Sequence, residues 1–254
     1  MNEINMANLT LNVRWQMFVN DTIRAFARHI LRRHKDNEHG ALLGGPGSGK
    51  GTLGTRLGPD RGLTLLGMGD VLRREDIQKE YGERLAAMSK GGLLPDALVH
   101  EILERELKQP AYKRGAIFDG VPRTLRQALL LERSLAWQGI SLDWVVLLEI
   151  DDEELVERLT HRRTCPNPKC RRTYHLIHNR PKVDGICDEC KTPLIQRKDD
   201  VREVIVERLR KYREEITPLC IFYKTRGVLY EVKPAKGSTP QEVFDLVKSV
   251  LTSN

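Results

Sequence analysis

The sequence has no apolar run of about eighteen residues or more, and this absence excludes a conventional transmembrane helix. Aromatic residues make up only 6%, and neither an internal repeat nor a low-complexity linker divides the chain. The 254 residues, 40% hydrophobic and 30% charged, are enough to bury a large core. The length therefore predicts one domain, or one domain with insertions.

Acidic residues are fewer than basic ones: 35 Asp and Glu stand against 42 Lys and Arg, which gives a net charge of +7. A positive surface suits a polyanionic ligand, whether a nucleotide, a nucleic acid or an acidic membrane. The charge alone selects none of these, and a solvated basic surface accounts for it equally well.

Cysteine is scarce, with five residues, and four of them form two close pairs: Cys165 with Cys170, and Cys187 with Cys190. No signal peptide is evident, so we expect the pairs to be metal ligands rather than disulfides. The fifth, Cys220, stands alone in an apolar run and is predicted to be a buried structural thiol.

Apolar residues near the N-terminus recur at three- and four-residue steps and predict an amphipathic helix within an extension over residues 1–38. They are Trp15, Phe18, Val19, Ile23, Phe26, Ala27, Ile30 and Leu31. A helix docked on the body of the protein, a membrane-surface helix and an organelle presequence all fit. Asp21, Asp36, Glu38 and the lack of serine count against a transit peptide. We expect a cytoplasmic protein, with a mitochondrial or other organelle location as the alternative that this helix leaves open.

From His39 onward, short β-like runs alternate with helical stretches, which predicts an α/β fold with a parallel sheet covered on both faces. The predicted strands are Ala41–Leu43, Leu63–Leu66, Ala116–Phe118, Trp144–Ile150 and Val228–Val232. The predicted helices include Pro95–Leu107, Arg126–Gln138, Glu153–Arg162 and Asp199–Ile216. Residues 164–196 break the alternation, because they hold the cysteine pairs and several prolines and would need a metal to hold them together.

A glycine-rich run, GGPGSGKGT from Gly44 to Thr52, follows the first predicted strand and precedes a helical stretch, as a phosphate loop requires. Glycines let the backbone curl so that N–H groups point at phosphate oxygens, and the following helix adds its positive N-terminal end. Lys50 supplies a mobile charge for the outer phosphates. Thr52 carries the hydroxyl that the strict pattern places directly after the lysine, where this chain has Gly51.

The GxPGxGKGT form of this loop resembles that of the adenylate kinase family of P-loop nucleoside monophosphate kinases, and further motifs match in order. Asp70–Arg73 resembles the family's GD-x-L-R segment, and Gly91–Val99 resembles the end of its acceptor insertion. Asp119–Thr124 resembles its DG-x-PRT signature. Arg158–Arg163 is similar to the R-x3-RR entry to its lid, and Arg197–Asp200 to the RKDD exit.

The resemblance implies a P-loop nucleoside kinase core, with a five-stranded parallel sheet flanked by helices, over residues 39–66, 95–160 and 198–254. It implies an acceptor-binding helical insertion at 67–94 and a zinc-ribbon-like lid at 161–197. The implied activity is reversible phosphoryl transfer from MgATP to AMP, giving two ADP. ATP with its Mg²⁺ and AMP are the expected partners, and we expect a monomer with no nucleic acid and no membrane span.

The resemblance also assigns site residues, position by position. The implied catalytic residues are Lys50, Arg123, Arg162, Arg197, Arg208 and Asp119. The implied ATP contacts are Gly45, Gly47, Ser48, Gly49, Lys50, Gly51, Thr52, Arg158 and Tyr174. The implied AMP contacts are Met68, Arg73, Leu94, Gly120, Arg123, Gln127, Arg197 and Arg208. Gln127 sits where the family has a glutamine that reads the adenine edge.

The chemistry of phosphoryl transfer independently requires several cationic side chains at one site. Two polyphosphates cannot meet until their charge is neutralised, and phosphoryl transfer depends on positioning and electrostatics rather than on a nucleophilic side chain. Arginine suits this need because its planar fork binds two phosphate oxygens. The plain alternatives are a solvated surface charge for each arginine, turn capping for Asp119, and helix N-capping for Asp199 or Asp200.

The cysteine pairs are separated by sixteen residues, which suits a tetrahedral site of four thiolates, and they resemble the zinc-bearing long lid of some bacterial adenylate kinases. Cys165, Cys170, Cys187 and Cys190 are the candidate ligands of a structural Zn²⁺, since four protein ligands leave no open position for chemistry. The first pair encloses four residues, where the usual knuckle encloses about two. Four free thiols or two disulfides are the alternatives.

Met68 departs from the family pattern, because the family has Thr or Ser before this Gly-Asp pair and methionine offers no strong hydrogen bond. A related kinase that takes another monophosphate as acceptor, or GTP as donor, is therefore an alternative. A third candidate, from a different class, is a zinc-ribbon protein that binds nucleic acid. The basic charge and the cysteine pairs fit it, but no aromatic stacking platform is evident.

Overall fold

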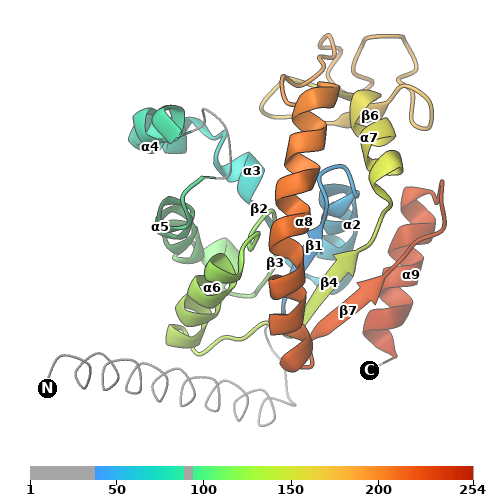
Figure 1. Ribbon diagram of the computed structural model, residues 1–254. Coiled ribbons are helices and arrows are strands. Elements are labelled where there is room, and N and C mark those ends of the chain that lie inside the picture. Colours follow the sequence, from blue (N-terminus) through green and yellow to red (C-terminus); the bar gives the residue numbers. More distant parts are fainter. Residues whose placement is uncertain (1–37, 89–93, 254) are drawn as a thin grey trace, which may run out of the picture.

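The computed structural model describes residues 38–88 and 94–253 (Figure 1). The predicted N-terminal amphipathic helix lies outside the described residues, as do residues 89–93 of the expected acceptor insertion. Within the part of the chain that is described, no helix is both long enough and apolar enough to cross a membrane.

Five parallel strands form the central sheet, in the order β2-β3-β1-β4-β7. They are β1 (Glu38–Gly44), β2 (Thr64–Gly67), β3 (Gly115–Asp119), β4 (Trp144–Leu148) and β7 (Leu229–Val232). The central strands are short apolar runs buried on both faces, as expected inside a parallel sheet. The register places Gly40 opposite Trp144 and Ala41 opposite Phe118. The predicted five-stranded parallel sheet is confirmed.

Helices cover both faces of this sheet (Figure 1). Those that flank it are α2 (Lys50–Arg61), α5 (Asp96–Leu107), α6 (Leu125–Trp137), α8 (Arg202–Thr225) and α9 (Pro240–Thr252). Apolar residues of α2 and α9 pack on one face, and those of α5, α6 and α8 pack on the other. A 3-10 turn, η1 (Pro110–Tyr112), leads into β3. Thr124 caps α6 by accepting the backbone N–H of Gln127.

Two groups of elements lie beyond the carboxyl ends of the strands (Figure 1). α3 (Met68–Val71) and α4 (Glu75–Met88) follow β2 on one side, and α7 (Asp152–Thr160) leads toward the lid on the other. The lid contains an antiparallel pair, β5 (Arg162–Thr164) and β6 (Thr173–His175). The end of β1, where the glycine-rich loop begins, therefore lies between two groups of elements that come from different parts of the chain.

Helix α8 is longer than predicted, because it ends at Thr225 rather than Ile216. Pro218 lies inside it and removes a backbone hydrogen bond. Leu219 and Tyr223, just beyond the proline, are buried against the sheet, so their packing keeps the helix continuous.

The start of α8 also differs from its prediction. The N-cap residue is Val201, which gives no side-chain cap. The prediction that Asp199 or Asp200 caps this helix is therefore wrong. The carboxylate of Asp200 is instead fully buried against Arg162. Helix α7 likewise ends at Thr160, before its predicted end, because Arg162 begins β5.

The lone Cys220 lies on α8 and is only partly buried, where the sequence predicted full burial. It packs against the core cluster, and burial raises the pKa of its thiol to about 11. A thiol with this pKa is a poor nucleophile at neutral pH, so the structural role predicted for it still holds.

Gly40 tests the packing of the sheet. A Cβ at this position would lie 2.2 Å from the indole ring of Trp144, which is buried on the neighbouring strand. Gly40→Ala should therefore lower the free energy of unfolding by about 3 kcal/mol, the upper part of the range for overpacking. Urea unfolding measures the effect.

The control is Gly82→Ala, at a position inside α4 where the nearest atom to an added Cβ is a flexible glutamine oxygen at 3.6 Å. A helical alanine there should raise stability by about 0.5–1 kcal/mol. Equal effects of the two substitutions would show that contact with Trp144 does not limit position 40.

Candidate active site

The glycine-rich loop connects β1 to α2 at the carboxyl end of the sheet (Figure 1). Gly47 and Gly49 have φ of 85° and 92°, values that L-residues with side chains rarely adopt. A Cβ on Gly47 would also lie 2.8 Å from a side-chain carbon of Leu159 on α7. The loop thus takes a tight curve that ends at the positive N-terminus of α2, which is the geometry of an anion site.

Lys50 is the first residue of α2, and its side chain folds back into the loop. Its Nζ donates to the carbonyl oxygens of Gly44 at 2.7 Å and Gly45 at 2.8 Å, and lies 3.2 Å from Ser48 Oγ. The ammonium group is therefore held at the mouth of the loop by acceptors that phosphate oxygens can replace.

Burial lowers the pKa of Lys50 from its ordinary value of 10.5 to about 8. Asp119 opposes this shift, whereas Arg123, Arg208 and Arg162 reinforce it by charge repulsion. Arg123, Arg208 and Arg162 come from the β3–α6 connection, α8 and β5, and their charges all act on Lys50. A group of cations of this kind suits a polyphosphate.

Asp119 is the last residue of β3, and its negative charge raises the pKa of Lys50 against the effect of burial. Burial raises the pKa of Asp119, while Lys50 and Arg123 act in the opposite direction. A Cβ on Gly51 would lie 3.4 Å from Asp119 Oδ2, so the start of α2 runs directly beside this carboxylate.

Two further arginines, Arg162 and Arg208, are held in place by aspartates just before α8. Arg162 pairs with the buried Asp200 through Nε at 2.8 Å and Nη2 at 2.5 Å. Arg208 contacts Asp199 Oδ2 at 2.8 Å. These carboxylates hold the two guanidinium groups in position and balance part of their charge.

Arg197 completes this cationic group. Its Nε donates to Thr164 Oγ1 at 3.1 Å. Burial lowers the pKa of Arg197, and repulsion from Arg162 and Arg73 lowers it further. The structure thus connects the lid arginines electrostatically with Arg73 of the opposite wall.

On that opposite wall, Arg73 pairs with Asp70 at 2.8 Å. Met68, the residue that departs from the family pattern, is buried in the core, and a Cβ on Gly120 would lie 3.7 Å from its own Cβ. Leu94 is partly buried and packs against the same core. Of the four expected acceptor contacts on this side, Met68 is buried and Leu94 is partly buried in the core, whereas the side chain of Arg73 is half exposed.

Gln127 is also buried on this side, and its amide is fixed at both ends. Oε1 accepts the backbone N–H of Arg123 at 2.8 Å, and Nε2 donates to Asp96 Oδ1 at 2.9 Å. Asp96 also accepts from Thr124 at 3.1 Å. Sequence reasoning missed Asp96, although its place at the start of α5, directly after Pro95, was a visible signal of a helix N-terminus.

Arg158 and Tyr174, both expected to contact ATP, are placed differently. Arg158 pairs with Glu154 at 2.6 Å on α7, and the same carboxylate oxygen accepts from Gly237 N at 3.4 Å. Tyr174 is buried in the lid, where its hydroxyl accepts from Asp188 N at 2.7 Å and lies 3.5 Å from Cys187 Sγ. Tyr174 therefore supports the cysteine cluster, and its contact with ATP stays a prediction.

The four lid cysteines form one cluster, in which all Sγ atoms lie within 4.8 Å of one another. Cys165 and Cys190 are 3.3 Å apart, and Cys170 and Cys187 are 3.5 Å apart. Sulfurs bound tetrahedrally to zinc, at about 2.3 Å from the metal, lie about 3.8 Å from each other. The donor set and its spacing therefore fit a closed metal site.

The long first knuckle closes by a local turn. Asn167 O accepts the backbone N–H groups of Cys170 at 3.0 Å and Arg171 at 2.9 Å, and Arg171 takes a left-handed φ of 49°. In the second knuckle, Lys191 N donates to Cys187 O at 3.0 Å, and Lys191 has a φ of 61°. Both knuckles thus end in the same turn, despite their different lengths.

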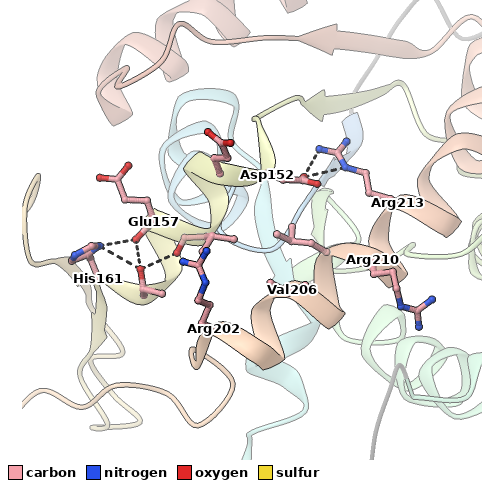
Figure 2. A pocket seen from close by; sticks show the side chains of 11 residues that line it. Asp152, Glu157, His161, Arg202, Val206, Arg210 and Arg213 are labelled. Atoms are coloured by element: carbon pink, nitrogen blue, oxygen red, sulfur yellow. Dashed lines mark hydrogen bonds and ion pairs between the residues drawn. The ribbon is translucent and has the colours of Figure 1, made fainter.

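A cavity of about 630 Å³ lies outside this cleft, between α7 and α8 (Figure 2). Three of its charged side chains form ion pairs: Arg213 contacts Asp152 at 2.5 Å, and Arg210 contacts Glu207 and Glu214. None of the site residues predicted from sequence lines it. It is a surface groove, and the candidate site remains the glycine-rich loop after β1 with the charged residues around Lys50.

A phosphate loop that faces arginines from a lid on one side and from a helical insertion on the other is the arrangement of P-loop nucleoside monophosphate kinases, which are phosphotransferases. Comparison with known families agrees with this class: a family model described as Adenylate kinase matches residues 42–228.

Curated relatives carry the same description. An adenylate kinase of Finegoldia magna is 40% identical over 193 residues, which cover 75% of this chain and 89% of the relative. That of Archaeoglobus fulgidus is 42% identical over 198 residues, 77% of this chain and 90% of the relative. That of Thermotoga maritima is 42% identical over 196 residues, covering 75% and 87%. The chain belongs to the adenylate kinase family.

The pKa of Lys50 predicts how ATP affinity depends on pH. The ammonium form binds a polyphosphate, so affinity is fully present below a pH of about 8 and is lost as the pH rises through that value. Between pH 7 and pH 9 the Kd for ATP should rise by about tenfold. Binding titrations at fixed ionic strength measure it.

Lys50→Arg is the control, because a guanidinium group stays charged over this range. Its Kd for ATP, whatever its absolute value, should remain flat between pH 7 and pH 9. A parallel rise in both proteins would assign the effect to another group.

Proposed function

We propose that this chain transfers a phosphoryl group reversibly from MgATP to AMP, giving two ADP. The observation that supports the proposal is the group of cations beside the glycine loop: Arg162 and Arg208 share the carboxylate of Asp200, and both, with Arg123, act by charge on Lys50. A phosphoryl group in transfer spreads its charge over several oxygens, and positioned cations stabilise that charge without taking part in covalent chemistry.

On the donor side, we infer that the loop from Gly45 to Thr52 wraps the ATP phosphates and that Lys50 leaves its carbonyl partners for phosphate oxygens. Arg158 lies on α7, which borders the loop through the contact of Leu159 with Gly47, and would face the base of ATP. Asp119, beside Lys50, would hold the water shell of Mg²⁺, which neutralises phosphate charge when it is bound.

On the acceptor side, Arg73, Arg123 and Arg197 would bind the monophosphate, and the repulsion between Arg73 and Arg197 supports a common target. Gln127 would read the base, with Gly120 and Leu94 beside it. All these groups come from one chain, so we infer that the protein acts as a monomer.

The lid cysteines would hold a structural Zn²⁺. The lid has few buried apolar residues: its cluster consists of Cys165, Tyr174 and Cys187, with Leu194 and the other two cysteines packed against it. A core this small cannot by itself fix the lid arginines, whereas a tetrahedral metal site can.

A related kinase with another acceptor remains the second candidate, because Met68 presents no hydroxyl beside Gly120. An apolar residue at a base pocket discriminates weakly, while a site with fixed polar groups discriminates strongly. The fixed amide of Gln127 favours adenine, so AMP is the acceptor that we propose.

A coupled assay with AMP, GMP, CMP and UMP as acceptors, and with ATP or GTP as donor, tests the proposal. AMP with ATP should give the highest kcat/KM, because the amide of Gln127 is held in a single orientation. Lys50→Met is the negative control, and it should lose on the order of 10²–10³ in rate while the fold is retained. Faster turnover with UMP or CMP would establish the second candidate, and no turnover with any monophosphate would refute both.

Metal analysis tests the lid. Purified protein should contain about one zinc per chain, and Cys187→Ser should reduce this to near zero, because a buried ligand is lost. Cys220→Ser, which changes the cysteine outside the cluster, is the matched control and should keep the metal. Protein that is fully active and contains no metal would contradict a structural zinc.

A further inference from the structure

Arg171 lies directly after the first zinc knuckle and reaches across the cleft to the acceptor side. Its Nη1 donates to Asp70 Oδ1 at 3.0 Å and to the Asp70 carbonyl oxygen at 3.2 Å. Among the described residues, this is the one ion pair that joins the lid, 161–197, to α3 or α4. The contact therefore connects two parts of the enzyme that bind different substrates.

The position of Arg171 is unfavourable for its backbone. Its φ of 49° lies in the left-handed region, where glycine is the residue without steric cost. The corresponding residue of the second knuckle, Lys191, has a φ of 61° and makes only a local contact, from Nζ to Asp188 O at 2.9 Å. The two knuckles thus carry the same strained turn, but the side chain of one alone reaches the opposite wall.

The carboxylate that Arg171 reaches is shared. Asp70 Oδ1 also accepts from Arg73 Nη2 at 2.8 Å, so two guanidinium groups meet at one oxygen. Burial raises the pKa of Asp70, but the hydrogen bonds from Arg73 and Arg171 outweigh it and leave the pKa below its ordinary value. Like charges repel, so either arginine holds Asp70 more strongly once the other has left.

On the basis of the function proposed above, we propose that Arg171 is a positioning residue: it takes over Asp70 when the lid docks and so releases Arg73 to bind the acceptor phosphate. By reciprocity, an acceptor phosphate that draws Arg73 away strengthens the contact between Asp70 and Arg171 and favours the docked lid. Asp70 is thus an exchange partner through which acceptor binding and lid docking stabilise each other.

The surroundings support this exchange. A cavity of about 310 Å³ lies between the lid and the edge of the sheet, lined by Pro168 and Arg171 from the lid and by Leu65 and Tyr112 from the opposite side. The two walls are therefore incompletely packed against each other here, so the polar contact is not fixed by a surrounding apolar interface. Asp70 is also more than half exposed, so the pair can open and close without burying an unpaired charge.

The test compares glycine substitutions at the two equivalent turns. Arg171→Gly and Lys191→Gly both relieve a left-handed residue, but only the first removes the contact with Asp70. In steady-state assays at low ionic strength, Arg171→Gly should raise the KM for AMP by about two- to five-fold, the range for an exposed ion pair. Lys191→Gly should leave the KM for AMP unchanged. Arg171→Lys should give a KM for AMP between those of the wild type and Arg171→Gly, because lysine keeps the positive charge but lacks the planar guanidinium group.

A double-mutant cycle separates the exchange from a general effect on the lid. In an Asp70→Asn background, where Arg73 no longer has a charged competitor, Arg171→Gly should not change the KM for AMP further. Zinc content, measured on every variant, should stay at the wild-type level, which excludes loss of the lid fold as the cause.

An unchanged KM for AMP in Arg171→Gly, an equal rise in Lys191→Gly, or a full effect of Arg171→Gly in the Asp70→Asn background would each overturn the inference. None of these results touches the proposed function, which the wild-type enzyme tests by turning over AMP. If the wild type transfers phosphate to no monophosphate, the proposed function fails and the inference fails with it.

Discussion

The structure depends on one electrostatic constraint: several cationic side chains must stand close together beside the glycine-rich loop. Repulsion within this group is large enough to reinforce the effect of burial on Lys50. The protein relieves the repulsion with its own oxygen atoms, since carbonyls of the loop hold Lys50, and Asp199 and Asp200 hold Arg208 and Arg162. Phosphate oxygens can take the place of these acceptors, so this arrangement suits a polyanion.

The charged side chains come from two parts of the fold, the central sheet and the lid, which are held together by different interactions. Asp119 ends the central strand β3, and Lys50 begins α2 after the loop that leaves β1, so packing on both faces of the sheet fixes the backbone around them. Arg162 and Arg197 belong to the lid, whose small core is built around the cysteine cluster. Apolar packing of the sheet therefore positions Lys50 and Asp119, whereas the cysteine cluster of the lid helps to position Arg162 and Arg197.

Much of the fold follows from the sequence, because buried parallel strands and a glycine loop are local patterns. The boundaries of α8 do not, since Pro218 and the aspartates before Val201 are local signals that tertiary contacts overrode. The site residues were assigned by resemblance and remain predictions, because a sequence does not show which of these side chains lie close together. Asp96 and Arg171 were missed because their partners, Gln127 and Asp70, lie 31 and 101 positions away. The burial of Tyr174 beside Cys187 was not foreseen for the same reason, because it depends on how the lid packs on itself.

The fixed amide of Gln127 has a consequence for molecular recognition. A free glutamine side chain can turn its amide over and present either order of donor and acceptor. Here Arg123 N occupies one lone pair of Oε1, and Asp96 occupies one hydrogen of Nε2, so the order is set before any base arrives. Adenine offers an amino hydrogen beside a ring nitrogen lone pair, whereas guanine offers the opposite order at the same edge. A purine that would need the amide reversed must first break two hydrogen bonds, so Asp96 turns an adaptable side chain into a directional one.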